Sequence, residues 1–154
     1  MAGGIGCAPF PAFLADIERE GRRATMIYGE RSAGELPLLD WFRARCDAVV
    51  VTTDDGSAGT AGLVTGPLAE RLRGPDRDRL HLYACGPSPM LKAVARQALA
   101  AKVVCDLALE APMACGFGVC LGCVVPTRES PDGPVAYERV CVEGPVMRAE
   151  RMAW

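Results

Sequence analysis

The chain has 154 residues, half of them apolar, enough to bury the core of one ordinary domain or of one domain with a small appendage. A formal charge of -2 gives no basic surface, so nucleic-acid binding is not expected. Since the sequence shows neither a long apolar run nor a secretion signal, we expect a cytoplasmic protein without a membrane span, whose eight cysteines are metal ligands and core thiols rather than disulfides.

The first residues form a glycine-rich turn that leads into a predicted helix at 9–20. Free N–H groups after Gly3, Gly4 and Gly6, together with the helix dipole, favour a pyrophosphate at this place. A dinucleotide-binding fingerprint must follow a strand, and only Met1 and Ala2 precede the glycines. We therefore expect the first strand to be missing, and a plain turn at a helix entry is an equal alternative.

Up to about residue 110, β-rich runs alternate with helical patterns, which indicates an α/β fold with a parallel sheet. The predicted strands are 24–28, 48–53, 80–85 and 103–109. Ser32 to Glu35 is typical of a capping box for a helix whose start is delayed by Pro37, and another helix covers 67–73. Ser88 is predicted to cap the clearest helix, whose buried side is expected to carry Met90, Leu91, Val94, Ala98 and Leu99.

Two polar loops follow predicted strands, and ligands bind at this edge of a doubly wound sheet. The candidate nucleotide-binding residues there are Asp54, Asp55, Gly56, Ser57, Cys85, Gly86, Pro87 and Met90. Ordinary turn chemistry is the alternative. His81, the only histidine, lies within a strand and is assigned no role, so acid–base or nucleophilic catalysis by this chain is not expected.

From Ala111 the composition changes to glycine, proline and cysteine, and we place a domain boundary there, giving domains 1–110 and 111–154. The only strand pattern in the second part is a hairpin, 123–127 with 135–140, around Ser130, Pro131, Asp132 and Gly133. A segment this poor in large apolar residues needs a metal centre in order to fold.

Four cysteines in this segment have the spacing of a [2Fe-2S] site. Cys115, Cys120, Cys123 and Cys141 follow C-x4-C-x2-C with a distant fourth ligand, the plant-type pattern. Nearby glycines allow the backbone to curl so that three thiolates can converge. Structural zinc and unligated core thiols are the alternatives. Zinc sites usually pair two C-x2-C knuckles, whereas this chain has one.

Several motifs together resemble one family. They are Gly3-Gly4-Ile5-Gly6 with Ala8-Pro9, Tyr28-Gly29-x-Arg31-Ser32 with Glu35-Leu36, Asp54-Asp55-Gly56-Ser57-x-Gly59, Cys85-Gly86-Pro87-x-Pro89-Met90, Met113-Ala114-Cys115-Gly116-x-Gly118-x-Cys120 and Tyr137-x-Arg139-Val140-Cys141-x-x-Gly144-Pro145-Val146. The chain resembles the electron transfer subunit of class 1B dihydroorotate dehydrogenase, of the ferredoxin reductase superfamily. Members carry an FAD-binding β-barrel, then a nicotinamide-binding domain, then a [2Fe-2S] domain, so the resemblance implies an N-terminally truncated chain.

The resemblance further implies a relay in pyrimidine biosynthesis. Electrons from dihydroorotate would pass from FMN in a separate catalytic subunit through the cluster to FAD and NAD, within a hetero-oligomer. The four cysteines would ligate iron, Gly4, Gly6 and the loop 54–57 would contact NAD, and 86–90 would lie near the nicotinamide. FAD is expected in the full-length subunit and is doubtful for this chain, because no segment that binds it is recognisable.

Two other functions stay open. One is the small subunit of a ferredoxin:NADP oxidoreductase or a related flavoprotein reductase, in which an aspartate tends to replace one thiolate; all four cysteines are present here. The other is a zinc-stabilised interaction module. Anaerobic colour and metal content would separate it from an electron carrier.

Overall fold

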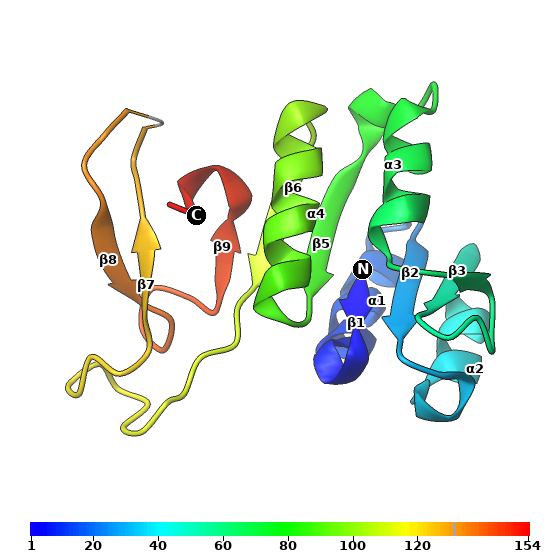
Figure 1. Ribbon diagram of the computed structural model, residues 1–154, viewed down its shortest axis with the longest axis horizontal. Helices are drawn as coiled ribbons and strands as arrows, with labels where there is room; N and C mark the ends of the chain where they lie inside the picture. The colour runs from blue at the N-terminus through cyan, green and yellow to red at the C-terminus, as the bar shows by residue number, and fades with distance from the viewer. Residues whose placement is uncertain (131) are drawn as a thin grey trace.

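The computed structural model describes residues 1–130 and 132–154, and it consists of a central sheet covered by helices with a hairpin at one side (Figure 1). The strands are β1 Ala2–Gly3, β2 Thr25–Glu30, β3 Ala48–Thr53, β4 Thr60–Ala61, β5 His81–Cys85, β6 Val104–Ala108, β7 Val124–Thr127, β8 Ala136–Arg139 and β9 Val146–Arg148. The helices are α1 Phe10–Arg19, α2 Leu39–Arg45, α3 Thr65–Arg73 and α4 Ser88–Ala100, with short 3-10 turns at Gly4–Cys7 (η1), Ala33–Glu35 (η2), Arg77–Arg79 (η3) and Ala149–Arg151 (η4).

The described strands form a seven-stranded sheet in the order β4-β3-β2-β1-β5-β6-β9 and a separate pair, β7-β8. Every neighbouring pair in the large sheet is parallel except β6 with β9. The chain runs outward from β1 to β4 and then returns to place β5 on the other side of β1. This reversal puts a topological switch point at the carboxyl ends of β1 and β5, where open α/β sheets bind ligands.

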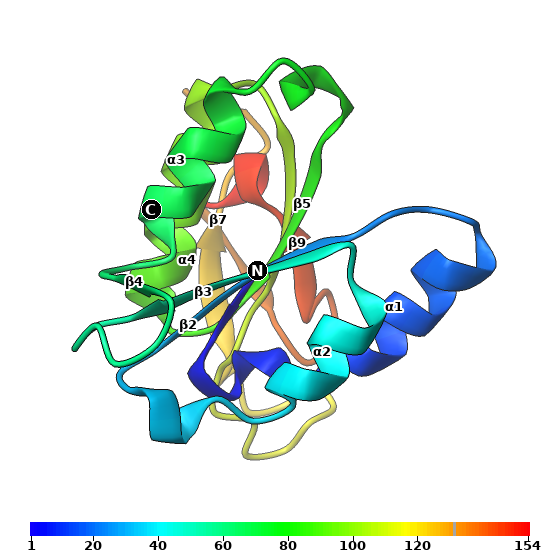
Figure 2. The same ribbon diagram turned by 90° about the vertical axis from the view of Figure 1, so that its right-hand side faces the viewer.

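Helices cover both faces of the sheet, as Figure 2 shows. On one face α1 and α2 bury Phe10, Leu14 and Phe42 against β1, β2 and β5. On the other face α3 and α4 bury Leu68 and Val94, among others, against β2, β5, β6 and β9. The α/β fold with a parallel sheet and a small hairpin, predicted from the sequence, is therefore confirmed.

The first strand is present in part, which corrects the prediction that it is missing. Ala2 and Gly3 pair with Tyr28 and Gly29 of β2, and Ala2 also pairs with Cys85 of β5. This strand could not be predicted from the sequence, because two residues are too few to show a strand pattern. A cavity of about 820 Å³ adjoins Met1 and lies between the amino ends of β2 and β5.

Both predicted serine caps are wrong. Ser32 makes no side-chain cap and begins a 3-10 turn, while α2 starts only at Leu39, after Pro37. Ser88 is already the first residue of α4, whose N-cap is Pro87 and which has no side-chain cap bond. Leu99, expected on the buried side of α4, is 46% exposed, because the buried stripe includes Ala95 together with the predicted Leu91, Val94 and Ala98.

The C-terminal segment contains a strand that the sequence did not reveal. The hairpin β7-β8 forms as predicted, although Pro131 of its predicted turn lies outside the described residues. After the hairpin, β9 returns to the large sheet and pairs antiparallel with β6. Its three residues are too few to give a periodic pattern, and β6 supplies the partner. Among the described residues, no helix is both long and apolar enough to cross a bilayer.

Candidate functional site

Two of the predicted nucleotide loops meet at the switch point. Gly3 ends β1 and Gly86 follows β5, and a Cβ on Gly86 would lie 3.1 Å from both the backbone N and O of Gly3. A Cβ on Gly6 would lie 2.4 Å from the carbonyl oxygen of Cys85, and one on Gly3 would lie 2.5 Å from Sδ of Met90. The loops pack this closely because these positions have no side chain.

Alanine at Gly6 should therefore force the two loops apart. We expect Gly6→Ala to lower the free energy of unfolding by about 1–3 kcal/mol, as overpacking of a tight site does, and to weaken any nucleotide bound there. Thermal unfolding measures the first effect and calorimetric titration with NADH the second. Gly66→Ala is the matched control, because a Cβ at Gly66 meets nothing within 4 Å. Equal stability of the two variants would contradict the close packing of the loops.

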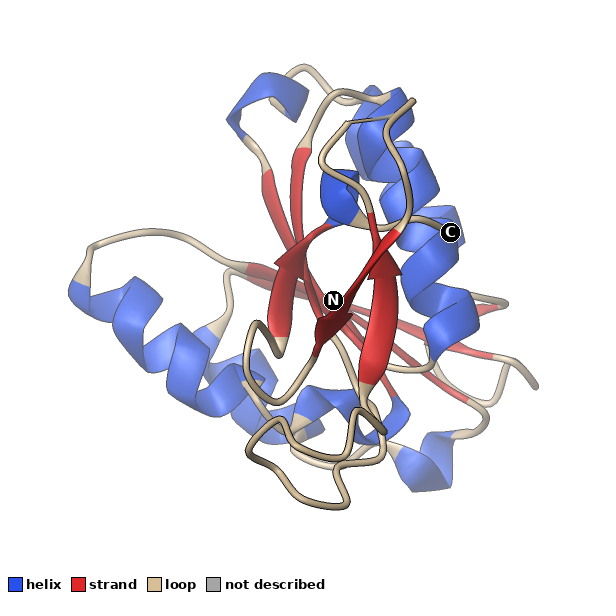
Figure 3. Ribbon diagram, turned by 90° about the vertical axis from the view of Figure 1, so that its left-hand side faces the viewer, coloured by secondary structure: helices blue, strands red, loops and turns tan. Residues whose placement is uncertain are grey.

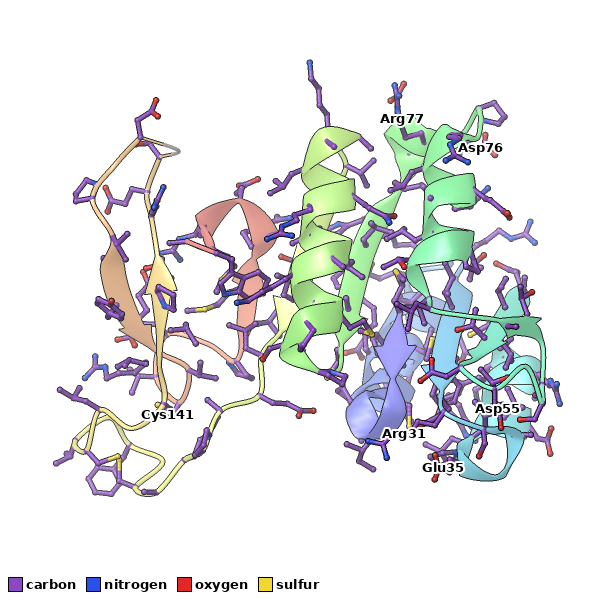
Figure 4. The ribbon with its side chains drawn as sticks, in the orientation of Figure 1. Arg31, Glu35, Asp55, Asp76, Arg77 and Cys141 are labelled. Carbon is purple, nitrogen blue, oxygen red and sulfur yellow. The ribbon has the colours of Figure 1, made fainter. Side chains whose placement is uncertain are left out.

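The third predicted loop, Asp54 to Ser57, follows β3, and its polar groups bind one another. Asp55 Oδ1 accepts hydrogen bonds from the N–H of Ser57 at 2.9 Å and from its hydroxyl at 2.6 Å. These bonds hold the pKa of the Asp55 carboxyl below its usual value. Ser57 Oγ also accepts the N–H of Ala33 at 2.8 Å, so the loop is tied to the segment after β2. Figure 4 shows Asp55 near Arg31 and Glu35 at this end of the sheet.

Sequence reasoning missed Glu30 as a candidate. It is the last residue of β2, and a Cβ on Gly4 would lie 3.3 Å from its Oε1, so its carboxylate adjoins the glycine turn. An acidic residue about 20 positions after the glycines commonly binds the ribose hydroxyls of NAD. The spacing from Gly6 was visible in the sequence, but the predicted strand ended at Tyr28 and left Glu30 in a loop.

His81, which was assigned no role, is a packed residue. Its Nε2 lies 2.7 Å from Asp106 Oδ2, and its ring stacks on Tyr83. Asp106 also pairs with Arg148 at 3.3 Å, so this group ties β5, β6 and β9 together. The contacts give His81 a structural role.

The four predicted ligand cysteines lie around one irregular loop at the base of the hairpin, drawn as a loop below the strands in Figure 3. The loop turns through Gly116 and Gly118 at φ values of 72° and 86°, and Leu121 also has a positive φ. The thiols contact in two pairs, Cys115 with Cys120 and Cys123 with Cys141. In the described part of the chain, no three His, Cys, Asp or Glu side chains already converge closely enough to hold a metal ion.

Backbone N–H groups point at these sulfurs. Hydrogen bonds from the N–H groups of Cys120 and Phe117 lower the pKa of the Cys115 thiol to about 6. The N–H of Cys141 lowers the pKa of Cys123, whereas the bond with the Cys123 thiol raises that of Cys141. The N–H of Gly122 lies 3.4 Å from Cys120 Sγ. Four thiol donors with amide N–H groups directed at them fit an iron–sulfur cluster, whose sulfurs accept such bonds.

The cysteine loop and the nucleotide loops lie on the same side of the molecule. Figure 1 shows the loop before β7 at the lower end, where β1, β2 and β5 also end. Figure 4 places Cys141 at the base of the hairpin on this lower side. Cys123 and Val140 are buried in the same core as α4 and β6, so the base of the hairpin packs on the large sheet. A centre held by the cysteines would thus face the same way as the switch point.

Two family models match the chain. The oxidoreductase NAD-binding domain matches residues 1–96, and the iron–sulfur cluster binding domain of dihydroorotate dehydrogenase B matches residues 110–153. Their order is the order predicted from the sequence.

Relatives of one kind align with almost the whole chain. A homolog of the dihydroorotate dehydrogenase B (NAD(+)) electron transfer subunit from Aquifex aeolicus is 38% identical over 99% of this chain and 56% of its own length. The subunit from Caldanaerobacter subterraneus is 40% identical over 99% and 57%, and the probable subunit from Thermococcus kodakarensis is 41% identical over 99% and 58%. The chain therefore spans just over half the length of these relatives.

Solved structures share the fold. A chain from an NADH-dependent reduced ferredoxin-NADP oxidoreductase, studied for flavin-based electron bifurcation, superimposes with a TM-score of 0.79 at 30% identity, covering 99% of this chain and 52% of its own. A type IV self-sufficient cytochrome P450 monooxygenase matches at 0.56 and 19%, and 26% of its chain is covered, which shows the fold alone. With both domain models matched in order and relatives of one kind throughout, the chain belongs to the oxidoreductase NAD-binding domain family and is a homologue of the dihydroorotate dehydrogenase B electron transfer subunit.

Proposed function

We propose that the chain is an electron carrier whose four cysteines, Cys115, Cys120, Cys123 and Cys141, hold a [2Fe-2S] cluster. The observation that carries this proposal is the set of backbone N–H groups aimed at the cysteine sulfurs in a loop built on positive-φ glycines. Such a cluster, when bound, takes up and gives back single electrons. Structural zinc sites usually pair two C-x2-C knuckles, whereas this chain has one, so the cysteine spacing favours iron.

The relay proposed for the whole protein runs from the FMN of a dihydroorotate dehydrogenase catalytic subunit, through the cluster, to FAD and NAD. The names of the relatives, electron transfer subunits of dihydroorotate dehydrogenase B (NAD(+)), support a dehydrogenase partner and NAD as the acceptor. In this chain, the glycine loops 3–6 and 86–90 would bind the pyrophosphate and nicotinamide of NAD, and Glu30 would bind a ribose hydroxyl. FAD is assigned to the part of the relatives that this chain does not match.

The surface around the cysteine loop supports a protein partner there. Phe117, Val119 and Leu121 lie between the ligand cysteines and are 70%, 71% and 57% exposed. Large apolar side chains gathered on a loop commonly mark an interaction site. A flavin subunit docked on this loop would keep the electron path short, which is why we place the catalytic partner on this surface.

The test begins with anaerobically purified protein. We expect visible charge-transfer absorption, about two irons and two sulfides per chain, and a rhombic electron paramagnetic resonance signal after reduction, as for a [2Fe-2S] centre. Zinc in place of iron, without colour, would overturn the proposal. Joined to a barrel domain and mixed with the FMN subunit, the chain should lose colour when dihydroorotate is added.

A second candidate is a subunit of a ferredoxin-NADP oxidoreductase, favoured by the solved structure that covers 99% of this chain. The two functions differ in the electron donor. If reduced ferredoxin decolourises the assembled protein and dihydroorotate with its FMN subunit does not, the reductase is the correct function.

A further inference from the structure

Arg139, the last residue of β8, binds both halves of the cysteine site. Its Nη1 donates a hydrogen bond to the carbonyl oxygen of Gly118 at 3.2 Å, in the middle of the loop from Cys115 to Cys120. Its own carbonyl accepts the N–H groups of Val142 and Glu143 at 3.0 and 2.9 Å, closing the turn that carries Cys141. Arg139 therefore connects the loop with three cysteines to the turn with the fourth.

Glu143 fixes the guanidinium in this place. The Glu143 carboxylate accepts bonds from Nη2 and Nε of Arg139, the latter at 3.2 Å, and from its backbone N–H at 2.6 Å. The two side chains are 36% and 32% exposed, so solvent screens the pair only in part. Because the guanidinium is planar, a carboxylate that binds one edge fixes the direction of the remaining N–H groups. These N–H groups can then hold a carbonyl in a defined position.

Gly118 fits against this pair only because it is glycine. Its φ is 86°, and a Cβ would lie 2.7 Å from Val142 Cγ2 and 3.1 Å from Arg139 Nη1. The N–H of Gly118 faces the Cys141 sulfur while its carbonyl faces Arg139. Gly118 thus contacts the ligand Cys141 through its N–H and Arg139 through its carbonyl.

We propose that Arg139, held by Glu143, is a positioning residue of the cluster, and that the ion pair between these two residues sets the net charge next to the cluster. The inference rests on the proposed function, since it assumes iron at the four cysteines. Reduction adds an electron to the cluster, so a positive neighbour favours reduction and a negative neighbour opposes it. The Arg139 guanidinium interacts electrostatically with Cys123 and Cys141, close enough to act in this way.

The test uses charge changes of opposite sign. In Arg139→Gln the Glu143 carboxylate loses its partner, so the reduction potential should fall; in Glu143→Gln the guanidinium is left unbalanced, so it should rise. Arg139→Lys keeps the charge but not the planar fork, and should leave the potential near that of the parent. All three variants should release iron to a chelator about tenfold faster or more, because a charge-assisted bond is lost.

Arg151→Gln is the matched control, because Arg151 pairs with Glu138 on the hairpin and not with Glu143. Its potential and iron release should match the parent. Equal potentials in Arg139→Gln and Glu143→Gln, or unchanged iron release in all three variants, would overturn the inference while leaving a cluster and the proposed function intact. A parent protein that holds zinc would instead overturn the proposed function itself.

Discussion

Replacing Cys120 with serine is expected to abolish the visible absorption of the cluster and to make the loop 111–123 sensitive to protease. The segment has few large buried side chains of its own, so ligation supplies much of its folding free energy, on the order of 10 kcal/mol for a structural metal site. The structure also predicts which residues remain protected from the protease. β9 pairs with β6, and Met147 and Ala149 are 3% and 2% exposed in the main core. Residues 146–151 should therefore stay protected while the loop and hairpin are cut.

Cys46→Ser is the matched control for this prediction. Cys46 is half-buried at the end of α2, near the opposite edge of the sheet from the hairpin. Its replacement should leave the colour and the resistance to protease unchanged. Absorption spectra and limited proteolysis with mass spectrometry check both results. A coloured, protease-resistant Cys120→Ser protein would show that Cys120 is not a ligand.

The parallel sheet could be predicted because its strands carry their own signal. The run 48–53, Ala48 with three valines and two threonines, matches β3 residue for residue. The predicted β5 differs by one residue at its start and the predicted β6 by one residue at each end. By contrast, β1 and β9 have two and three residues, and each exists because a neighbouring strand offers a partner. Pairing between distant segments leaves no trace in local sequence, so these two strands could not be foreseen.

The ligand set could be read from cysteine spacing, whereas its supports could not. Arg139 belonged to a motif of the resemblance but was given no role, and its contact with Gly118 joins residues 21 positions apart. The serine caps failed for a related reason, since Ser88 and Ser32 have the right residue type but the neighbouring prolines decide where each helix begins. Spacing reveals groups that act on one centre; side chains that act through another residue become visible only in three dimensions.

The α-amino group of Met1 is expected to make the 154-residue chain less stable as the pH falls from about 8 to about 5. Met1 is 7% exposed, and its amino group donates to the carbonyl of Tyr83 at 2.5 Å. Burial lowers the pKa of this group from 8.0 to about 5. Between these values the unfolded chain binds a proton that the folded chain does not, so the free energy of unfolding rises with pH across this window. Three pH units correspond to roughly 4 kcal/mol at most.

Acetylation of the Met1 α-amino group removes its titration and leaves every other titrating group unchanged. The cavity of about 820 Å³ beside Met1 has room for an acetyl group, which would continue β1 backwards between β2 and β5. The acetylated chain should therefore melt higher than the free chain at pH 5.5 and nearly equally at pH 8.5, as thermal unfolding at several pH values would show. A constant difference between the two chains at every pH would mean that the amino group is not buried. An advantage confined to low pH is what a buried α-amino group must give, because only its charge changes with pH.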